Sequence, residues 1–273
     1  MATSREAVAK IYGQIAELEN NRLATHPMER EITLRAIRHG LSTVASSGSS
    51  SKLIVEIGGG PGKLAFALAD EGHTVDLIDL SPDLIRLAQA EQDRRIAAER
   101  EPLLRSIGTG NALDGNAFDK DVYDAVLLLG PLYHLLDELE RKQAVENALE
   151  LANPKCGSVF CAFVSREAHL RDLVTREPER LVKQKNFYTA YLATGRYESD
   201  EIRHFFQKHF PKTLELISLR STEGILGGGL DTALIDADAE VVRSWADLML
   251  EKYSENEVHL GCADHLLAVL RRK

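Results

Sequence analysis

The residues best suited to chemistry are a group of glycines and an aspartate that follow two short apolar runs. The first run, residues 53–57, continues through closely spaced glycines into a helical pattern; the glycines are Gly58, Gly59, Gly60 and Gly62. Because glycine has no Cβ, such a turn brings bare backbone close to a ligand. Asp79 ends the second run, and a carboxylate there can accept hydrogen bonds from both hydroxyls of a ribose. The pattern predicts a site for a cofactor that contains a nucleoside.

The spacing of the glycines argues against a dinucleotide cofactor. The dinucleotide pattern G-x-G-x-x-G, begun at Gly58, requires a third glycine where this chain has Lys63. Pro61 also removes a backbone N–H that could have bound a phosphate. The loop therefore predicts a cofactor without a pyrophosphate.

Residues 55–62 resemble motif I of the class I S-adenosylmethionine-dependent methyltransferases, and later segments continue the resemblance in the same order. Residues 110–114 resemble the segment that meets the adenine, and residues 130–135 read G-P-L-Y-H-L after the predicted fourth strand. That last segment is typical of a group of bacterial and fungal small-molecule methyltransferases, and the resemblance covers roughly residues 10 to 272. It implies S-adenosylmethionine as cofactor and S-adenosylhomocysteine as product.

The resemblance also implies a set of cofactor contacts: Tyr12, Glu56, Gly58, Gly59, Gly60, Gly62, Asp79, Leu80, Asn111, Ala112 and Leu129. Asn111 stands where aspartate is usual, and its side-chain carbonyl can still accept from the adenine amine, without a charge. Glu19 and Asn20 replace a tyrosine–aspartate pair of many relatives, which weakens the expected role of the amino-terminal segment. Glu56 has two open roles, as a partner of the cofactor's ammonium group or as a cap of a neighbouring helix.

Tyr133 and His134 follow the predicted fourth strand, where a methyl acceptor must approach, and are the candidate catalytic residues. Histidine has a pKa suited to a general base near neutral pH, but His134 could equally be a wall of the pocket, and Tyr133 a core residue. Further candidates for the acceptor side, each with an ordinary structural alternative, are Arg22, His26, Tyr191 and Glu223. His265 begins the last predicted strand and is expected to be structural. The spacing of histidines and acids suggests no metal site.

The segments around these residues alternate between strand and helix patterns up to about residue 165, which predicts a parallel sheet with helices on both faces. We expect an α/β fold, a doubly wound, Rossmann-like sheet of seven strands with a helical cap. By family resemblance, the last strand runs antiparallel beside the sixth. Four parts are expected: helices that cover the cofactor site (1–50), the cofactor-binding core (51–165), a helical lid over the substrate (166–212), and the last strands with an inserted helix (213–273). The lid is rich in aromatic residues, which include Phe205 and Phe206.

The composition of the chain argues against nucleic acids and membranes as binding partners. The chain has 273 residues and a formal net charge of −9, and its few basic runs are short and scattered, whereas enzymes of nucleic acids usually carry a basic face. Three cysteines form neither a disulfide framework nor a metal set, and no run of about 18 apolar residues occurs. We expect a cytoplasmic monomer or homodimer that binds neither nucleic acid nor membrane.

The expected function is methylation of a small molecule by in-line transfer from S-adenosylmethionine to an oxygen, nitrogen or sulfur nucleophile. No Asn/Asp-Pro-Pro-Tyr sequence follows the fourth strand, which disfavours methylation of the exocyclic amines of bases. Two alternatives stay open. An RNA or protein methyltransferase would need a basic or extended groove, and a non-catalytic scaffold would keep only the cofactor site.

Overall fold

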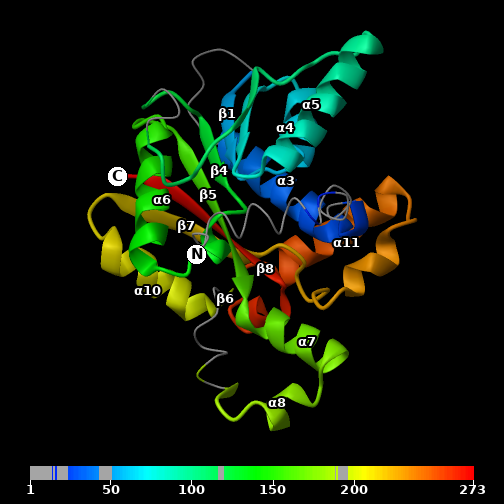
Figure 1. Cartoon of the computed structure of the whole chain (residues 1–273), viewed down its shortest axis with the longest axis vertical. Coiled ribbons are helices and arrows are strands. Elements are labelled where there is room, and N and C mark those ends of the chain that lie inside the picture. The colour runs from blue at the N-terminus through cyan, green and yellow to red at the C-terminus, as the bar shows by residue number, and fades with distance from the viewer. Residues whose placement is uncertain are drawn as a thin grey trace.

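The computed structural model describes residues 14, 16, 24–42, 51–115, 120–187, 189 and 196–273 (Figure 1). Eight strands form one mixed sheet in the order β3-β2-β1-β4-β5-β8-β7, and β6 pairs with β5 outside that path. The strands are β1 (Leu53–Ile57), β2 (Thr74–Asp79), β3 (Ser106–Thr109), β4 (Ala125–Leu128), β5 (Ser158–Ser165), β6 (Arg196–Tyr197), β7 (Leu214–Ser221) and β8 (His265–Arg272).

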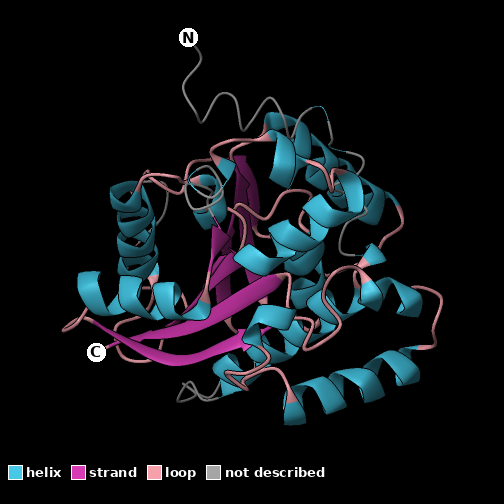
Figure 2. Cartoon of the chain, turned by 90° about the horizontal axis from the view of Figure 1, so that it is seen from below, coloured by secondary structure: helices cyan, strands magenta, loops and turns pink. Residues whose placement is uncertain are grey.

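Helices cover both faces of this sheet, as Figure 2 shows. The α-helices are α3 (Pro27–Ser42), α4 (Lys63–Asp70), α5 (Pro82–Ala97), α6 (Glu138–Leu151), α7 (Arg166–Arg176), α8 (Arg180–Lys183), α10 (Ser199–His209) and α11 (Ala239–Lys252). Three short 3₁₀ helices complete the described elements: η1 (Leu132–His134), η2 (Leu230–Leu234) and η3 (Leu260–Cys262). In the described part of the chain, no helix combines the length and the apolar character needed to cross a membrane.

The central strands are apolar because both of their faces are buried. Along β1, Val55 and Ile57 point into a core shared with α6 and α10, whereas Ile54 points into a second core shared with α3, α4 and α5. A parallel strand covered on both faces reads as a continuous apolar run, since alternate side chains enter different cores. Glu56 is the buried exception in this run.

The predicted doubly wound fold is confirmed, including the position of the last strand. Strand β8 lies between β5 and β7 and is antiparallel to both. The two-residue strand β6, parallel to the end of β5, was not predicted. Side chains cap two helices at their starts: the Ser81 side chain accepts from the N–H of Leu84, and that of Asp137 from the N–H of Leu139.

Helix α10 lies in the segment expected to form a lid, but it packs in the core. Helix α10 buries Ile202, Phe205 and Phe206 in the core cluster that also holds Val126 and Leu128 of β4, so its aromatic side chains are core residues. The expectation that Phe205 and Phe206 cover the substrate is therefore wrong. The cause is the amphipathic pattern of α10, whose apolar side packs against β7 and the sheet.

Helix α3 connects the sheet to the helical layer formed by α11. Its buried Met28 and Ile32 pack against Ala246 and Met249 of α11. Further along, α3 packs so closely on the sheet that a Cβ at Gly40 would lie 2.6 Å from Cζ of Phe160 in β5. This docking holds the first turns of α3 beside the start of β8.

Candidate active site

The glycine loop occupies the edge of the sheet where β1 ends, next to the segment that leaves β4. Gly58, Gly60 and Gly62 have φ angles of 72°, 56° and 76°. A Cβ at Gly58 would lie 2.7 Å from Cδ of Pro131, so this position combines a left-handed backbone with a close approach of a second loop. The strand order reverses between β1 and β4, which is where parallel α/β sheets bind ligands.

Asp79 joins the glycine loop to the end of β2. One carboxylate oxygen accepts the N–H of Gly60 at 2.8 Å, and the other accepts the N–H of Ser81 at 2.7 Å. The side chain is buried but still lines the pocket. Because each carboxylate oxygen has two lone pairs, these bonds leave Asp79 able to accept ribose hydroxyls as well.

Glu56 lies beneath the loop and serves α4. Its Oε2 accepts the N–H of Ala65 at 3.0 Å, one of the first N–H groups of that helix, while the N-cap residue Gly62 has no side chain to do so. Complete burial raises the pKa of Glu56 to about 8, and the nearby Asp79 carboxylate acts in the same direction. The helix-capping role is thus observed, and Glu56 also lines the pocket.

The segment expected to meet the adenine is held by its own hydrogen bonds. The side-chain oxygen of Asn111 accepts the N–H of Leu113 at 3.0 Å, and the Asn147 amide of α6 donates to the carbonyl of Ala112 at 2.9 Å. Both Asn111 and Ala112 line the pocket, together with Leu80 and Leu129. Asn111 thus resembles Asp79: each is a predicted cofactor contact whose side chain also accepts a backbone N–H of the adjoining loop.

These segments enclose one pocket of about 140 Å³ with mainly apolar walls. It contains most of the predicted site: Glu56, Gly58, Gly59, Gly60, Asp79, Leu80, Asn111, Ala112, Leu129, Tyr133 and His134. Gly62 is not in the wall, because it starts α4 and its α-carbon faces Leu77. Tyr12, Arg22 and Tyr191 fall outside the described residues, so their predicted roles stay predictions.

Tyr133 and His134 form η1 at one side of the pocket, with their ring centroids 4.5 Å apart. Burial, with a smaller effect of the Arg196 charge, lowers the pKa of His134 to about 4. The expectation of a near-neutral pKa at this histidine is therefore wrong. The sequence could not show it, because the cause is the tertiary burial of the ring.

His26, a further candidate on the acceptor side, is not in the pocket wall. Its Nδ1 lies 3.1 Å from Oδ1 of Asp231 in η2, an almost fully buried carboxylate. This contact attaches the start of α3 to the segment after β7. His26 supports the position of α3 here, and a direct role toward a substrate remains a prediction.

The pocket wall also includes residues that sequence reasoning missed. Glu29 and Thr33 of α3, Thr222 after β7, and His265 and Leu267 of β8 all belong to its wall. Thr222 directly follows β7 and His265 begins β8, whereas Glu29 and Thr33 lie within α3, so these residues share no sequence signal that could identify a site. Only the antiparallel insertion of β8 brings these segments together.

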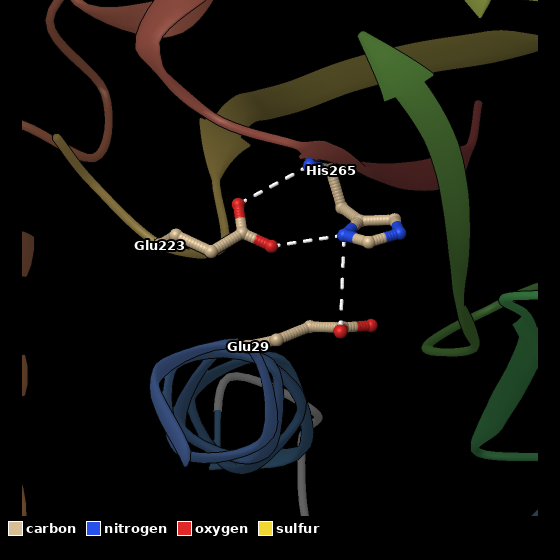
Figure 3. A group of neighbouring side chains, drawn as sticks. All are labelled: Glu29, Glu223 and His265. Carbon is tan, nitrogen blue, oxygen red and sulfur yellow. Dashed lines mark hydrogen bonds and ion pairs between the residues drawn. The ribbon is translucent and has the colours of Figure 1, made fainter. Parts of the chain in front are cut away.

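Glu223, predicted to face the substrate, lies directly behind this wall. Its Oε1 is 2.9 Å from Nδ1 of His265, and its Oε2 accepts the backbone N–H groups of Asp264 and His265 at 3.1 and 3.2 Å. Oε2 of Glu29 approaches the same Nδ1 to 3.8 Å, as Figure 3 shows. Burial raises the pKa of Glu223, while the His265 ring favours its ionised form.

Glu29, Glu223 and His265 are of residue types that bind metals, and their nearest ligand atoms lie within 4.8 Å of one another. Hydrogen bonds already account for this geometry. Nδ1 of His265 pairs with Glu223, and both Glu223 oxygens accept from neighbouring groups, including the Thr222 hydroxyl at 3.0 Å. We therefore treat Glu223 and His265 as a hydrogen-bonded pair, with Glu29 at ion-pair distance from the same ring nitrogen.

Comparison with known proteins gives the class. Residues 54–155 match the family described as a methyltransferase domain, which spans β1 to the turn before β5. No protein with a curated description matches the chain. Among solved structures, the plantazolicin methyltransferase BamL, in complex with a triazolic desmethylPZN analog and S-adenosylhomocysteine, is 12% identical with a TM-score of 0.60, covering 99% of this chain and 97% of that chain.

Two further structures share the fold. Magnesium protoporphyrin IX methyltransferase from Synechocystis PCC 6803, with bound S-adenosylmethionine, is 14% identical with a TM-score of 0.54, covering 99% of this chain and 98% of that chain. The methyltransferase in complex with the Haloferax volcanii Trm112 activator is 17% identical with a TM-score of 0.55, covering 95% and 96%. The family match and the shared fold identify the protein as an S-adenosylmethionine-dependent methyltransferase with the class I fold.

Proposed function

We propose that this methyltransferase acts on a small molecule, which it binds between η1 and the start of β8. The observation that carries the proposal is the single pocket that continues from the glycine loop and Asp79 to Tyr133, His134 and His265. Its walls are mainly apolar, and Lys63 is the only lysine or arginine among the described residues that line it. A polymer with a phosphate backbone would be expected to meet several basic side chains.

The cofactor residues are proposed as follows. The loop Gly58–Gly60 passes over the methionine end, Asp79 accepts the ribose hydroxyls with Leu80 beside them, and Asn111 and Ala112 meet the adenine. Leu129 closes the pocket between cofactor and acceptor. Glu56 receives the cofactor's ammonium group while it caps α4, and Gly62 contributes by starting that helix.

The chemistry needs little from the protein beyond positioning. S-adenosylmethionine, when bound, supplies a methyl group already activated by its sulfonium. The pocket holds the acceptor in line with that methyl group and keeps water away, and Tyr133 and His134 form the wall against which the acceptor rests. A neutral His134 can exchange a hydrogen bond with the acceptor at physiological pH.

The order of segments supports a division of labour along the chain. We propose that residues 51–165 bind the cofactor, that 1–50 cover it, and that 213–273 complete the sheet and one wall of the acceptor site. Within 166–212, the described parts of α7 and α8 are the candidates for a lid, since α10 belongs to the core. A cytoplasmic location and a monomeric or dimeric state remain predictions from composition.

Binding of S-adenosylhomocysteine by calorimetry tests the proposal, with Asp79→Ala as the variant. We expect micromolar affinity in the wild type and a loss of at least about tenfold in the variant, about 1.4 kcal/mol. Because Asp79 also holds the loop, thermal unfolding of the free proteins is measured in parallel. Absence of binding by the wild type would overturn the assignment of the pocket, and transfer to RNA or protein but to no small acceptor would favour a macromolecular substrate.

A further inference from the structure

We propose that His265 is the general base that accepts a proton from the methyl acceptor, with Glu223 and Glu29 as its positioning residues, and that the acceptor presents a hydroxyl group. This inference rests on the proposed function. Its basis is the part of the pocket wall at the start of β8, where a histidine ring and two carboxylates from distant segments meet (Figure 3).

The hydrogen bonds at His265 select one side of the ring. Oε1 of Glu223 lies 2.9 Å from Nδ1, so an ionised Glu223 stabilises the tautomer in which Nδ1 carries the proton. In that tautomer Nε2 is the basic nitrogen. Figure 3 shows Nε2 on the far edge of the ring, directed away from both carboxylates. His265 itself lines the pocket, and in the proposed arrangement its basic nitrogen faces the acceptor.

Carboxylates on the Nδ1 side of the ring favour a protonated imidazole during the reaction. Glu29 of α3 lies 3.8 Å from Nδ1, and Glu223 is in direct contact with the ring. Asp264, which precedes His265, is paired with Arg171 of α7 and adds a compensated charge. Two carboxylates beside one ring stabilise the imidazolium that forms when a proton arrives, as an oriented acid does in other histidine-dependent enzymes.

Glu223 is itself held rigidly. Its Oε2 accepts two backbone N–H groups, from Asp264 and His265, and its Oε1 accepts the Thr222 hydroxyl. The side chain is almost fully buried, so these bonds fix its orientation and direct Oε1 at the ring.

The other histidine of the pocket is a poorer base. Burial and the Arg196 charge hold His134 in its neutral form with a low pKa, whereas Glu223 is in direct contact with the ring of His265. A base is most useful for a nucleophile that must lose a proton, and a neutral hydroxyl is such a nucleophile at physiological pH. The two histidines thus indicate different roles, a wall for His134 and a proton acceptor for His265.

The reaction balances as an in-line displacement. The acceptor oxygen forms a bond to the methyl carbon while the bond from that carbon to the sulfonium sulfur breaks. The bonding pair stays on sulfur, which gives neutral S-adenosylhomocysteine. The hydroxyl proton passes to Nε2 of His265, and the positive charge of the sulfonium appears on the imidazolium between Glu223 and Glu29. Release of that proton to solvent restores the base.

The test compares two phenols of different acidity. Wild type, His265→Gln, Glu223→Gln and the control His204→Gln, an exposed histidine of α10, are assayed with phenol and with 4-nitrophenol at a pH where only the latter is ionised. We expect His265→Gln to lower kcat/KM for phenol by about 10²–10⁴-fold and to change it far less for 4-nitrophenolate. Glu223→Gln should show the same selectivity to a smaller degree, and His204→Gln should resemble the wild type.

Several outcomes would overturn the inference. Equal losses for both phenols in His265→Gln would show that His265 only shapes the pocket. Methylation of thiophenol or aniline, or of no acceptor, by a wild type that binds S-adenosylhomocysteine would reject the hydroxyl class while the proposed function stands. Inhibition by EDTA that a divalent cation reverses would assign the cluster to metal binding. Failure to bind S-adenosylhomocysteine would instead reject the proposed function.

A second measurement needs no acceptor. Nitrogen-15 NMR of the imidazole reports the tautomer, and we expect the Nδ1–H form of His265 in the wild type. Glu223→Gln should lower the pKa of His265, because a neutral amide no longer favours the imidazolium. An Nε2–H tautomer in the wild type, or a pKa of His265 unchanged by Glu223→Gln, would contradict the proposed arrangement even if the kinetic variants were poorly folded.

Discussion

The two ends of the pocket are built in different ways. The proposed cofactor end comes mainly from one contiguous unit, β1–α4–β2, and its polar groups already bond one another: Asp79 holds Gly60, and Glu56 holds α4. The proposed acceptor end gathers side chains from α3, η1, the segment after β7 and the start of β8. The first is therefore preorganised by local sequence, whereas the second exists only when distant segments are docked.

The largest effect is expected from a change that distorts the local unit. In Gly58→Ala, a residue with a φ of 72° gains a Cβ that would lie 2.7 Å from Pro131. Left-handed strain of about 1–2 kcal/mol and overpacking of about 1–3 kcal/mol act together. We expect S-adenosylhomocysteine affinity to fall by at least about 100-fold in calorimetry.

Gly72→Ala is the matched control for this change. Gly72 has a φ of 90° in the turn between α4 and β2, and an added Cβ there meets no atom within 4 Å. The same backbone strain without the clash should lower the free energy of unfolding by about 1–2 kcal/mol and leave affinity unchanged. Equal affinities of the two variants would show that the contact with Pro131 is not needed for binding.

Proton release on binding tests whether Glu56 contacts the cofactor or only caps α4. Its pKa of about 8 means that free protein carries this proton near pH 6.5. If Glu56 receives the cofactor's ammonium group, binding of S-adenosylhomocysteine should release about one proton, measured by calorimetry in buffers of different ionisation enthalpy. Glu56→Gln should release none and bind about tenfold more weakly. No release by the wild type would restrict Glu56 to capping α4.

The same group gives a pH dependence of stability. The pKa of Glu56 is raised in the folded state, from 4.5 to about 8, so the folded protein keeps a proton that the unfolded chain releases between these values. The stability from this proton is fully present below about pH 4.5 and is lost as the pH rises to about 8. The free energy of unfolding of Glu56→Gln, measured in denaturant, should therefore fall less with rising pH over this range than that of the wild type.

The smallest effect is expected at His134. With a pKa of about 4, this side chain stays neutral from pH 5 upward, so it adds no titration step to the rate in the physiological range. His134→Gln should lower kcat/KM by no more than about tenfold, the value of one hydrogen bond, and leave the shape of the pH profile unchanged. If this variant lost a titration step from the pH profile of kcat/KM, His134 would be a base, and the proposed difference in role between His134 and His265 would be wrong.

The sequence was informative where function is local. The loop Gly58–Gly60, the acid Asp79 and the turn at Asn111 could be predicted because each follows an apolar run at a spacing that a strand–turn–helix unit dictates. The helix starts at Ser81 and Asp137 were equally readable, since capping depends on residues within one turn.

The sequence was misleading where burial decides. Phe205 and Phe206 have the composition of a lid but the amphipathic spacing of a core helix, and His134 has the ordinary pKa of its type until its ring is buried. Both errors have one physical reason. Whether an aromatic side chain or an imidazole is buried depends on which elements pack against it, and the local sequence does not specify those elements.

By itself, then, the sequence determined the class I sheet, the glycine loop and the acid at the end of β2, because these depend on contacts within a few tens of residues. Only the tertiary structure decided that Glu29, Glu223 and His265 meet in the pocket wall. The antiparallel insertion of β8 between β5 and β7 carries His265 to Glu223, and the docking of α3 adds Glu29. Such contacts depend on how segments pack, and no local spacing encodes them.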